Sequence, residues 1–243
     1  NYGIDTFVPG MLYGVVARPP AYGANVISYD EQAAKQVEGV RSVVKIDRGI
    51  GICADTLQAA WKGREALNAK WDRGVEPTLS TASIEKVLAD GLDKPGREGR
   101  NDEGVPRALR QAHQRVLAEY FLPYLSHAIM EPMNATAHVQ ADQCEVWAPT
   151  QSQSGVQRAA APITGLEREQ IKVHTPYLGG GYGGRGATEG VQEAVALSKA
   201  TGKPIKVIWT REEDIKYEAY RPGYAHRIEA SLDQQGQVTS WTH

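Results

Sequence analysis

The stretch L-G-G-G-Y-G-G-R-G, from Leu178 to Gly186, decides how this chain is interpreted, because five glycines directly surround a single tyrosine and a sixth follows at Gly186. Glycine has no Cβ, so it permits positive φ angles and the close approach of another group, at an entropy cost on folding. A loop of this kind has little value as a core segment. It is more typical of a backbone built around a ligand, although a tight turn whose glycines only relieve crowding stays an alternative.

The loop is expected to join a strand to a helix. Residues 170–174 alternate polar and apolar side chains, as a half-buried strand does. Residues 188–200 place Val191, Ala194 and Val195 on one helical face. The order strand, glycine turn, helix predicts a ligand site at the turn.

The same segment also fits the dinucleotide fingerprint G-x-G-x-x-G at Gly179, Gly181 and Gly184. A strand expected over residues 204–210 ends near Glu212, which arrives later than the usual interval of about 20 residues. A run of three glycines fits this pattern by composition alone. A nicotinamide-dependent enzyme is therefore kept as an alternative.

Composition indicates a globular protein of one or two domains, with 243 residues, a net charge of −2 and 41% hydrophobic residues. Nothing in this balance predicts nucleic-acid binding, and no apolar run approaches the roughly 20 residues that span a bilayer. The chain begins at Asn1 and ends at His243 inside an expected hairpin. We therefore expect a piece of a longer protein, whose compartment the missing signal segment does not reveal.

The cysteines and histidines predict no metal ligands. Cys53 and Cys144 are too few and too far apart for a disulfide framework or a thiolate cluster, and each reads as a small buried hydrophobe. The six histidines form no H-x-x-x-H or H-E-x-x-H pair. Any metal would have to arrive inside a cofactor.

Pattern changes divide the chain into a small α/β unit at 1–72, a connector at 73–104 and a second part at 105–243. The expected elements fall on both sides of the connector. Strands are expected at 11–19, 26–29, 40–46, 50–54, 114–122, 135–140, 145–148 and 224–232, with a returning strand from 237, and helices after Asp55, at 80–90 and at 152–161.

Five motifs in this order resemble one family. They are H-A-I-M-E-P-M-N-A-T-A (127–137), C-E-V-W-A-P-T-Q (144–151), Y-L-G-G-G-Y-G-G-R (177–185), W-T-R-E-E-D (209–214) and Y-R-P (220–222). The chain resembles the large subunit of molybdenum hydroxylases of the xanthine oxidase family, nearest the isoquinoline 1-oxidoreductase β subunit and the related aldehyde dehydrogenases. The resemblance implies an α+β fold: an α/β hammerhead domain, opened by P-G-M-L-Y-G-V-V-A-R-P-P (9–20), and the first part of a mixed α/β molybdenum-pterin-binding domain.

The resemblance also implies the cofactor contacts. Gln151 stands where the family has a glutamine that donates toward an oxygen ligand of the metal, although a capping role stays open. Gly180, Gly181, Tyr182 and Gly183 match the family's G-G-G-F-G loop beside the molybdenum, with tyrosine in place of phenylalanine.

Other motif residues receive weaker interpretations. Gly186 stands where purine-oxidising members have a glutamate, which disfavours purine oxidation, and no residue matches the family's catalytic base. Glu131 is interpreted as structural, with His127 able to orient it or to be a satisfied buried histidine. Residues 210–214 are expected to form a solvated turn or a subunit contact.

The resemblance implies a fragment of an oxidoreductase that hydroxylates aldehydes or N-heterocycles with oxygen from water. Molybdenum with molybdopterin, expected as a dinucleotide, would be bound by the full-length subunit and not by this piece alone, and [2Fe-2S] clusters would lie on a small partner subunit, since the chain lacks cysteine motifs for them. A bacterial periplasmic or membrane-associated location is expected from the resemblance. A non-catalytic assembly domain stays a further alternative.

Overall fold

The structure, a computed structural model, describes residues 1–76 and 78–243, so Pro77 of the expected connector lies outside the described residues. The chain forms two compact units, and each combines two separated segments. Unit 1 contains residues 1–76 with Ser126–Arg221, and unit 2 contains Thr78–Leu125 with Pro222–His243.

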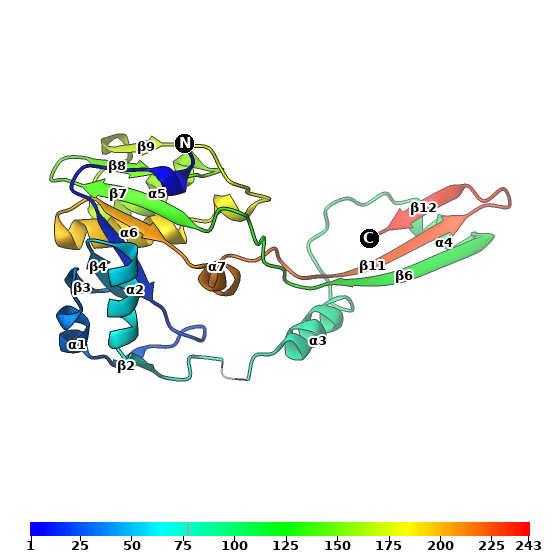
Figure 1. Cartoon of the computed structure of the whole chain (residues 1–243). Coiled ribbons are helices and arrows are strands. Elements are labelled where there is room, and N and C mark those ends of the chain that lie inside the picture. Colours follow the sequence, from blue (N-terminus) through cyan, green and yellow to red (C-terminus); the bar gives the residue numbers. More distant parts are fainter. Residues whose placement is uncertain (77) are drawn as a thin grey trace. The chain divides into compact units, whose positions relative to one another are not determined.

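Unit 1 is built on a mixed seven-stranded sheet in the order β3-β4-β1-β10-β7-β8-β9 (Figure 1). Strand β1 pairs in parallel with β10, with Leu12 opposite Ile205, so the start and the end of this unit share one sheet. The strands are β1 (Leu12–Ala17), β3 (Val40–Ile46), β4 (Gly49–Ala54), β7 (Asn134–Val139), β8 (Cys144–Trp147), β9 (Ile171–His174) and β10 (Ile205–Ile208). A separate pair joins β2 (Val26–Ser28) to β5 (Lys70–Trp71).

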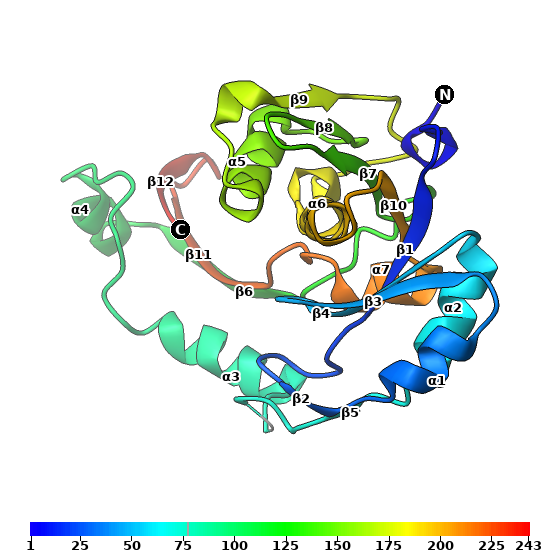
Figure 2. The same cartoon turned by 90° about the vertical axis from the view of Figure 1, so that its left-hand side faces the viewer.

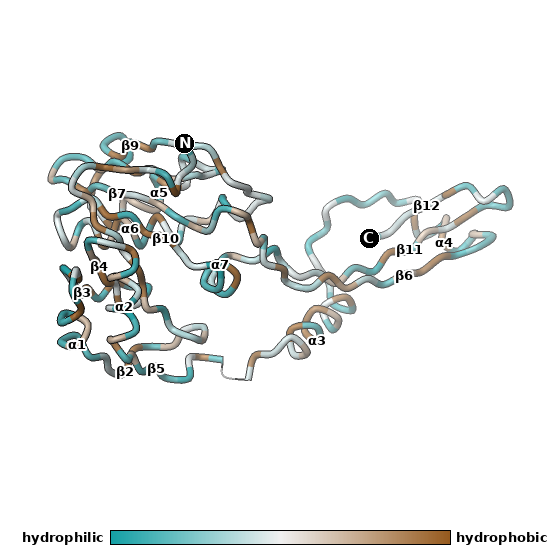
Figure 3. The backbone as a smooth tube through the Cα atoms, viewed as in Figure 1, coloured by the Kyte–Doolittle hydropathy of each residue, from teal (hydrophilic) through white to brown (hydrophobic). Residues whose placement is uncertain are grey.

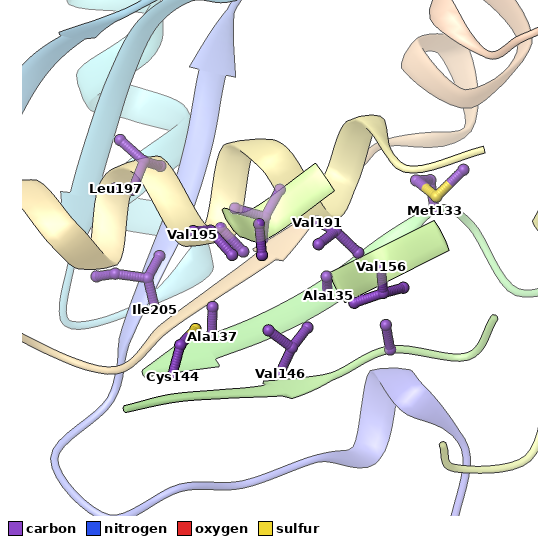
Figure 4. Close-up of a cluster of buried hydrophobic side chains, with 14 of the residues drawn as sticks. Met133, Ala135, Ala137, Cys144, Val146, Val156, Val191, Val195, Leu197 and Ile205 are labelled. Atoms are coloured by element: carbon purple, nitrogen blue, oxygen red, sulfur yellow. The ribbon is translucent and has the colours of Figure 1, made fainter. Parts of the chain in front are cut away.

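Helices cover both faces of this sheet (Figure 2). The helices α1 (Glu31–Gln36) and α2 (Leu57–Ala66) pack with Val15 in one core, while α5 (Gln153–Thr164) and α6 (Glu189–Thr201) pack with Val16 in the other. Neighbouring residues of a strand point to opposite faces, so Val15 and Val16 separate the two cores. Figure 4 shows the second core, in which Val191 and Val195 of α6 lie above Ala135 and Ala137 of β7.

Both cysteines lie in this second core, as small hydrophobes do. Cys53 and Cys144 are buried and unbonded, which confirms the sequence interpretation. Burial raises the pKa of the Cys53 thiol to about 12. Burial, with a smaller contribution from the Glu145 carboxylate, raises the pKa of the Cys144 thiol to about 11.

Two helix ends differ from the expectation. Thr56, and not Asp55, caps α2 by accepting a hydrogen bond from the Ala59 N–H, because Asp55 pairs with Arg41 across the turn. Helix α5 runs past Pro162 to Thr164, three residues beyond the expected end. A proline late in a helix removes one backbone bond without preventing the last turn.

The segment expected as a solvated turn is instead the helix α7 (Arg211–Tyr217), in which Glu213 and Asp214 are buried. Thr210 and Glu213 cap it reciprocally: the Thr210 Oγ1 accepts from the Glu213 N–H, and the Glu213 carboxylate accepts from the Thr210 N–H. The T-x-x-E spacing of this capping box is present in the sequence and would have predicted the start of the helix.

Unit 2 is a three-stranded antiparallel sheet in the order β12-β11-β6. Its strands β6 (Gln114–Leu122) and β11 (Tyr224–Leu232) have the expected bounds and pair along their whole length, and β12 is Val238–Thr242. The helices α3 (Thr81–Gly91) and α4 (Val105–Arg110) belong to this unit. Figure 3 shows hydrophobic and hydrophilic stretches alternating along β6 and β11.

The mixed α/β character of the predicted fold is therefore present in the chain. The two compact units describe contacts, and the assignment of 1–72 to a hammerhead, 73–104 to a connector and 105–243 to a cofactor domain stays a prediction. In the part of the chain that the structure describes, three short 3-10 turns complete the elements: η1 (Gly3–Asp5), η2 (Arg168–Gln170) and η3 (Gly184–Gly186). Among the described residues, no helix is long and apolar enough to cross a membrane.

Candidate functional site

The glycine loop leaves β9 and reaches α6 through the turn η3. Three of its residues have positive φ: Gly180 at +108°, Tyr182 at +50° and Gly183 at +106°. L-residues with side chains rarely adopt these angles, so the two glycines are required by the backbone path. Tyr182 holds a less common conformation for a tyrosine, and outliers of this kind are frequent at ligand sites.

Gln151 lies against this loop and holds it by its side chain. The Gln151 Oε1 accepts hydrogen bonds from the Gly183 N–H at 3.2 Å and from the Arg185 N–H at 3.1 Å. Since both partners are donors, the amide must turn its oxygen toward them, and its NH₂ group is left as a donor on the other side. Gln151 therefore anchors the loop and keeps a neutral donor available.

The loop also carries unused backbone donors. Across residues 1–76 and 78–243, no protein acceptor pairs with the N–H groups of Gly180, Gly181 or Tyr182. Three successive free N–H groups beside an amide NH₂ form a donor set that suits an anionic or oxygen-rich group. This donor set fits a molybdenum-pterin cofactor, and the loop, residues 178–186, contains no acidic side chain.

The side chain of Tyr182 is directed to solvent. Tyr182 is 82% exposed, so water can form the hydrogen bonds of its hydroxyl without a protein partner. The ring is free to cover a group bound at the loop.

A buried ion pair between Glu131 and Arg185 supports the loop. Glu131, 7% exposed, accepts hydrogen bonds from the Gly179 N–H at 2.7 Å and the Ile4 N–H at 2.9 Å. Its carboxylate lies 3.4 Å from the guanidinium of Arg185, which is 1% exposed and donates to the Glu131 and Pro132 carbonyls. With its oxygens occupied in this way, Glu131 has the structural role that the sequence indicated.

His127 has a different partner from the one considered. Its Nδ1 lies 3.0 Å from the Oε2 of Glu218, the residue after α7, and not beside Glu131. Glu218 Oε1 also accepts from the His127 N–H at 2.6 Å and from the Ser126 hydroxyl. Sequence reasoning could not find this pair, because no local pattern joins residues 91 positions apart.

Burial alters the ionisation of two groups near the loop. Burial lowers the pKa of Arg185, and the charges of Glu131, Asp214 and Glu218 oppose the shift without cancelling it. Burial raises the pKa of Asp214, although the Met133 N–H and Arg211 favour its ionised form. Of these groups, sequence reasoning gave a structural role to Glu131 but missed Asp214 and Glu218 as supports of the site.

The geometry does not favour the dinucleotide alternative. A dinucleotide-binding unit places the strands on either side of the glycine loop and helix next to one another. Here β9 and β10 are separated in the sheet by β8 and β7. Glu189 also opens α6 with a negative charge, where a pyrophosphate would need a positive end.

No protein-ligated metal centre is visible in the described ranges: none of their His, Cys, Asp and Glu side chains gather in a group of three or more that could hold an ion. The candidate site therefore consists of backbone donors, one amide and one tyrosine ring. Such a set can bind and orient a preformed cofactor.

Known proteins share both sequence and fold with this chain. The beta subunit of isoquinoline 1-oxidoreductase from Brevundimonas diminuta is 30% identical over 249 residues, covering 97% of this chain and 32% of that protein. A membrane-bound aldehyde dehydrogenase [pyrroloquinoline-quinone] from Gluconacetobacter polyoxogenes is 30% identical over 250 residues, covering 98% of this chain and 32% of that protein. The chain thus spans about a third of the length of these relatives.

The fold matches solved structures. Quinoline 2-oxidoreductase from Pseudomonas putida 86 superposes with a TM-score of 0.77 at 18% identity, over 99% of this chain and 36% of that one. The family model of the molybdopterin cofactor-binding domain matches residues 94–243, more than half of the chain. With the glycine loop and Gln151 inside the matched range, this chain belongs to the molybdopterin cofactor-binding domain family.

Proposed function

We propose that the chain is part of the large subunit of a molybdenum-pterin oxidoreductase that hydroxylates aldehydes or N-heterocycles with oxygen derived from water. The observation that carries the proposal is the donor set at the loop, the free N–H groups of Gly180 to Tyr182 beside the Gln151 amide. The names of the relatives, an isoquinoline oxidoreductase and an aldehyde dehydrogenase, support the same substrate classes.

In this proposal the chain binds and orients the cofactor. When bound, the molybdenum-pterin group supplies the redox centre at which a carbon–hydrogen bond is exchanged for a carbon–oxygen bond. The N–H groups of Gly180, Gly181 and Tyr182 would hold its oxygen atoms, and the Gln151 NH₂ would donate without adding charge. The exposed ring of Tyr182 would cover one side of the bound group.

The proton acceptor of the reaction is proposed to lie elsewhere in the subunit. Glu131 is unsuited to it, because backbone N–H groups, the Asn134 amide and Arg185 already occupy its oxygens. A base must reach the proton that it removes, and a carboxylate bound on every side cannot do so.

Electrons are proposed to leave through [2Fe-2S] clusters on a small partner subunit, since Cys53 and Cys144 are both buried and lie in different strands. A dinucleotide form of the cofactor and a periplasmic or membrane-associated location are proposed with it. The name of the membrane-bound relative supports the location.

The test is metal and pterin analysis of the full-length subunit co-expressed with its partner. We expect about one molybdenum and one pterin per subunit, with oxidation of an aldehyde or an N-heterocycle by an artificial acceptor. A subunit that folds and pairs with its partner but holds no molybdenum would favour the assembly-domain alternative.

A further inference from the structure

The ring of His127 lies directly under the glycine loop. A Cβ placed on Gly184 would lie 3.0 Å from the Cγ and Nδ1 of His127, and a Cβ on Gly183 would lie 3.5 Å from its Nε2. The absence of side chains at these two positions lets the ring approach the backbone. The imidazole therefore forms part of the loop's surroundings, and its Nε2 lies nearest to Gly183.

Glu218 fixes the orientation of this ring. It is 6% exposed, and its carboxylate accepts from the backbone N–H of His127 and the Ser126 hydroxyl and lies 3.0 Å from the Nδ1 of His127. An ionised carboxylate only accepts hydrogen bonds, so the proton of the neutral ring must be on Nδ1. The Nε2 of that tautomer carries a lone pair and accepts.

The other ring nitrogen is left without a protein donor. In the part of the chain that the structure describes, His127 Nε2 makes no hydrogen bond, while Gly183 above it is exposed. When a carboxylate binds one ring nitrogen of a histidine and the other nitrogen is free, the carboxylate orients the imidazole toward a ligand.

We propose that His127 is a ligand-binding residue of this site, which Glu218 holds with its proton on Nδ1, so that Nε2 accepts a hydrogen bond from an N–H or O–H group of the bound cofactor. A pterin ring system carries such N–H groups, and the N–H donors of the loop would remain available for oxygen atoms of the same cofactor. The identity of the ligand in this inference rests on the proposed function. The tautomer of His127 rests only on the contacts of its own ring.

The first experiment measures the tautomer without any cofactor. The 243-residue chain is labelled with ¹⁵N histidine, and long-range ¹H–¹⁵N spectra are recorded at pH 8, with His127 assigned by its loss in His127→Phe. We expect a protonated Nδ1 and an unprotonated Nε2. A proton on Nε2, alone or with one on Nδ1, overturns the acceptor role.

The second experiment measures cofactor content in the full-length subunit with its partner. His127→Phe keeps a flat ring under Gly184 but has no acceptor, and we expect about tenfold weaker retention of the pterin, as the loss of one hydrogen bond to a bound group predicts. His127→Gln can place its Oε1 near the position of Nε2 and should restore most of the retention. Equal retention in wild type and His127→Phe overturns the proposal.

A matched histidine controls for general damage. His174 also pairs with a carboxylate, the Oε1 of Glu145 at 3.0 Å, and stacks on Trp147 in the sheet. We expect His174→Phe to retain the cofactor as wild type does, and losses equal to those of His127→Phe would overturn the specific role. If the wild type holds no pterin at all, the proposed function fails, while the tautomer measurement still decides whether Glu218 orients His127.

Discussion

Two buried arginines in unit 1 have opposite environments. Arg18, just after β1, pairs with Glu193 at 2.5 Å and Glu213 at 2.7 Å, and its guanidinium stacks 4.2 Å from the Trp209 ring. Arg185, in the glycine loop, has one carboxylate at 3.4 Å and donates mainly to backbone carbonyls, and within residues 1–76 and 78–243 its buried Nε has no hydrogen-bond partner.

The difference appears in the ionisation of the two groups. Burial alone would lower the pKa of Arg18, but the charges and hydrogen bonds of Glu193 and Glu213 outweigh it and raise the pKa. For Arg185 burial prevails and the pKa is lowered. The ion pairs of Arg18 join β1 to α6 and α7 and occupy its guanidinium, while Arg185 supports a loop that keeps N–H groups without protein acceptors among the described residues.

The largest loss of stability is expected from breaking the ion pairs of Arg18. Glu193→Ala removes one of the two carboxylates that pair with the buried Arg18 and also removes the acceptor of the Trp209 Nε1–H. Removing one member of a buried ion pair costs about 3–5 kcal/mol. Chemical denaturation of the chain measures it, with Arg41→Ala, from the exposed pair with Asp55, as the control that should change little. Equal losses in both variants would contradict the distinction.

A smaller loss is expected at the loop arginine. Arg185→Met leaves Glu131 buried, but Glu131 keeps its hydrogen bonds from Ile4, Gly179 and Asn134. We expect a loss of about 2–3 kcal/mol, within the range for a hydrogen bond to a charged group. The same denaturation series checks it. A loss of stability larger than that of Glu193→Ala would show that Arg185, and not Arg18, contributes more to the stability of the unit.

Backbone geometry at the loop gives the next test. Gly183→Val places a β-branched side chain at a φ of +106°, and strained conformations of this kind cost about 1–3 kcal/mol. We expect the full-length subunit to fold and to lose its molybdenum. Gly186→Ala is the matched control, because a Cβ there meets no atom of the described residues within 4 Å. Normal metal content in Gly183→Val would mean that the loop only turns the chain.

The smallest change in stability separates the two roles of Gln151. Gln151→Ala removes the acceptor for two loop N–H groups, at a cost of about 1–2 kcal/mol, and should lower turnover. Gln151→Glu keeps an acceptor for both N–H groups but replaces the outer donor with negative charge. We expect near-normal stability and low molybdenum content in the glutamate variant. If it loads and turns over like the wild type, the outer NH₂ group has no role.

Short-range patterns in the sequence determined much of the secondary structure and where to look for the site. Strands β6 and β11 have the predicted bounds, and the apolar face of α6 is buried as expected, because alternation and helical periodicity depend on near neighbours. The glycines of the loop were equally readable, since positive φ leaves a direct mark on residue choice. The capping box of α7 was present in the sequence and was overlooked.

Only the tertiary structure decided which distant groups meet. Arg18 and Glu193 are 175 residues apart, and His127 and Glu218 are 91 apart, so no local pattern predicts either pair. Asp55 looked like the cap of α2 until its pairing with Arg41 left that role to Thr56. The sequence specifies the helices and strands through local propensity. The partners of the buried charges depend on how these elements pack, because only packing brings distant segments within hydrogen-bonding distance.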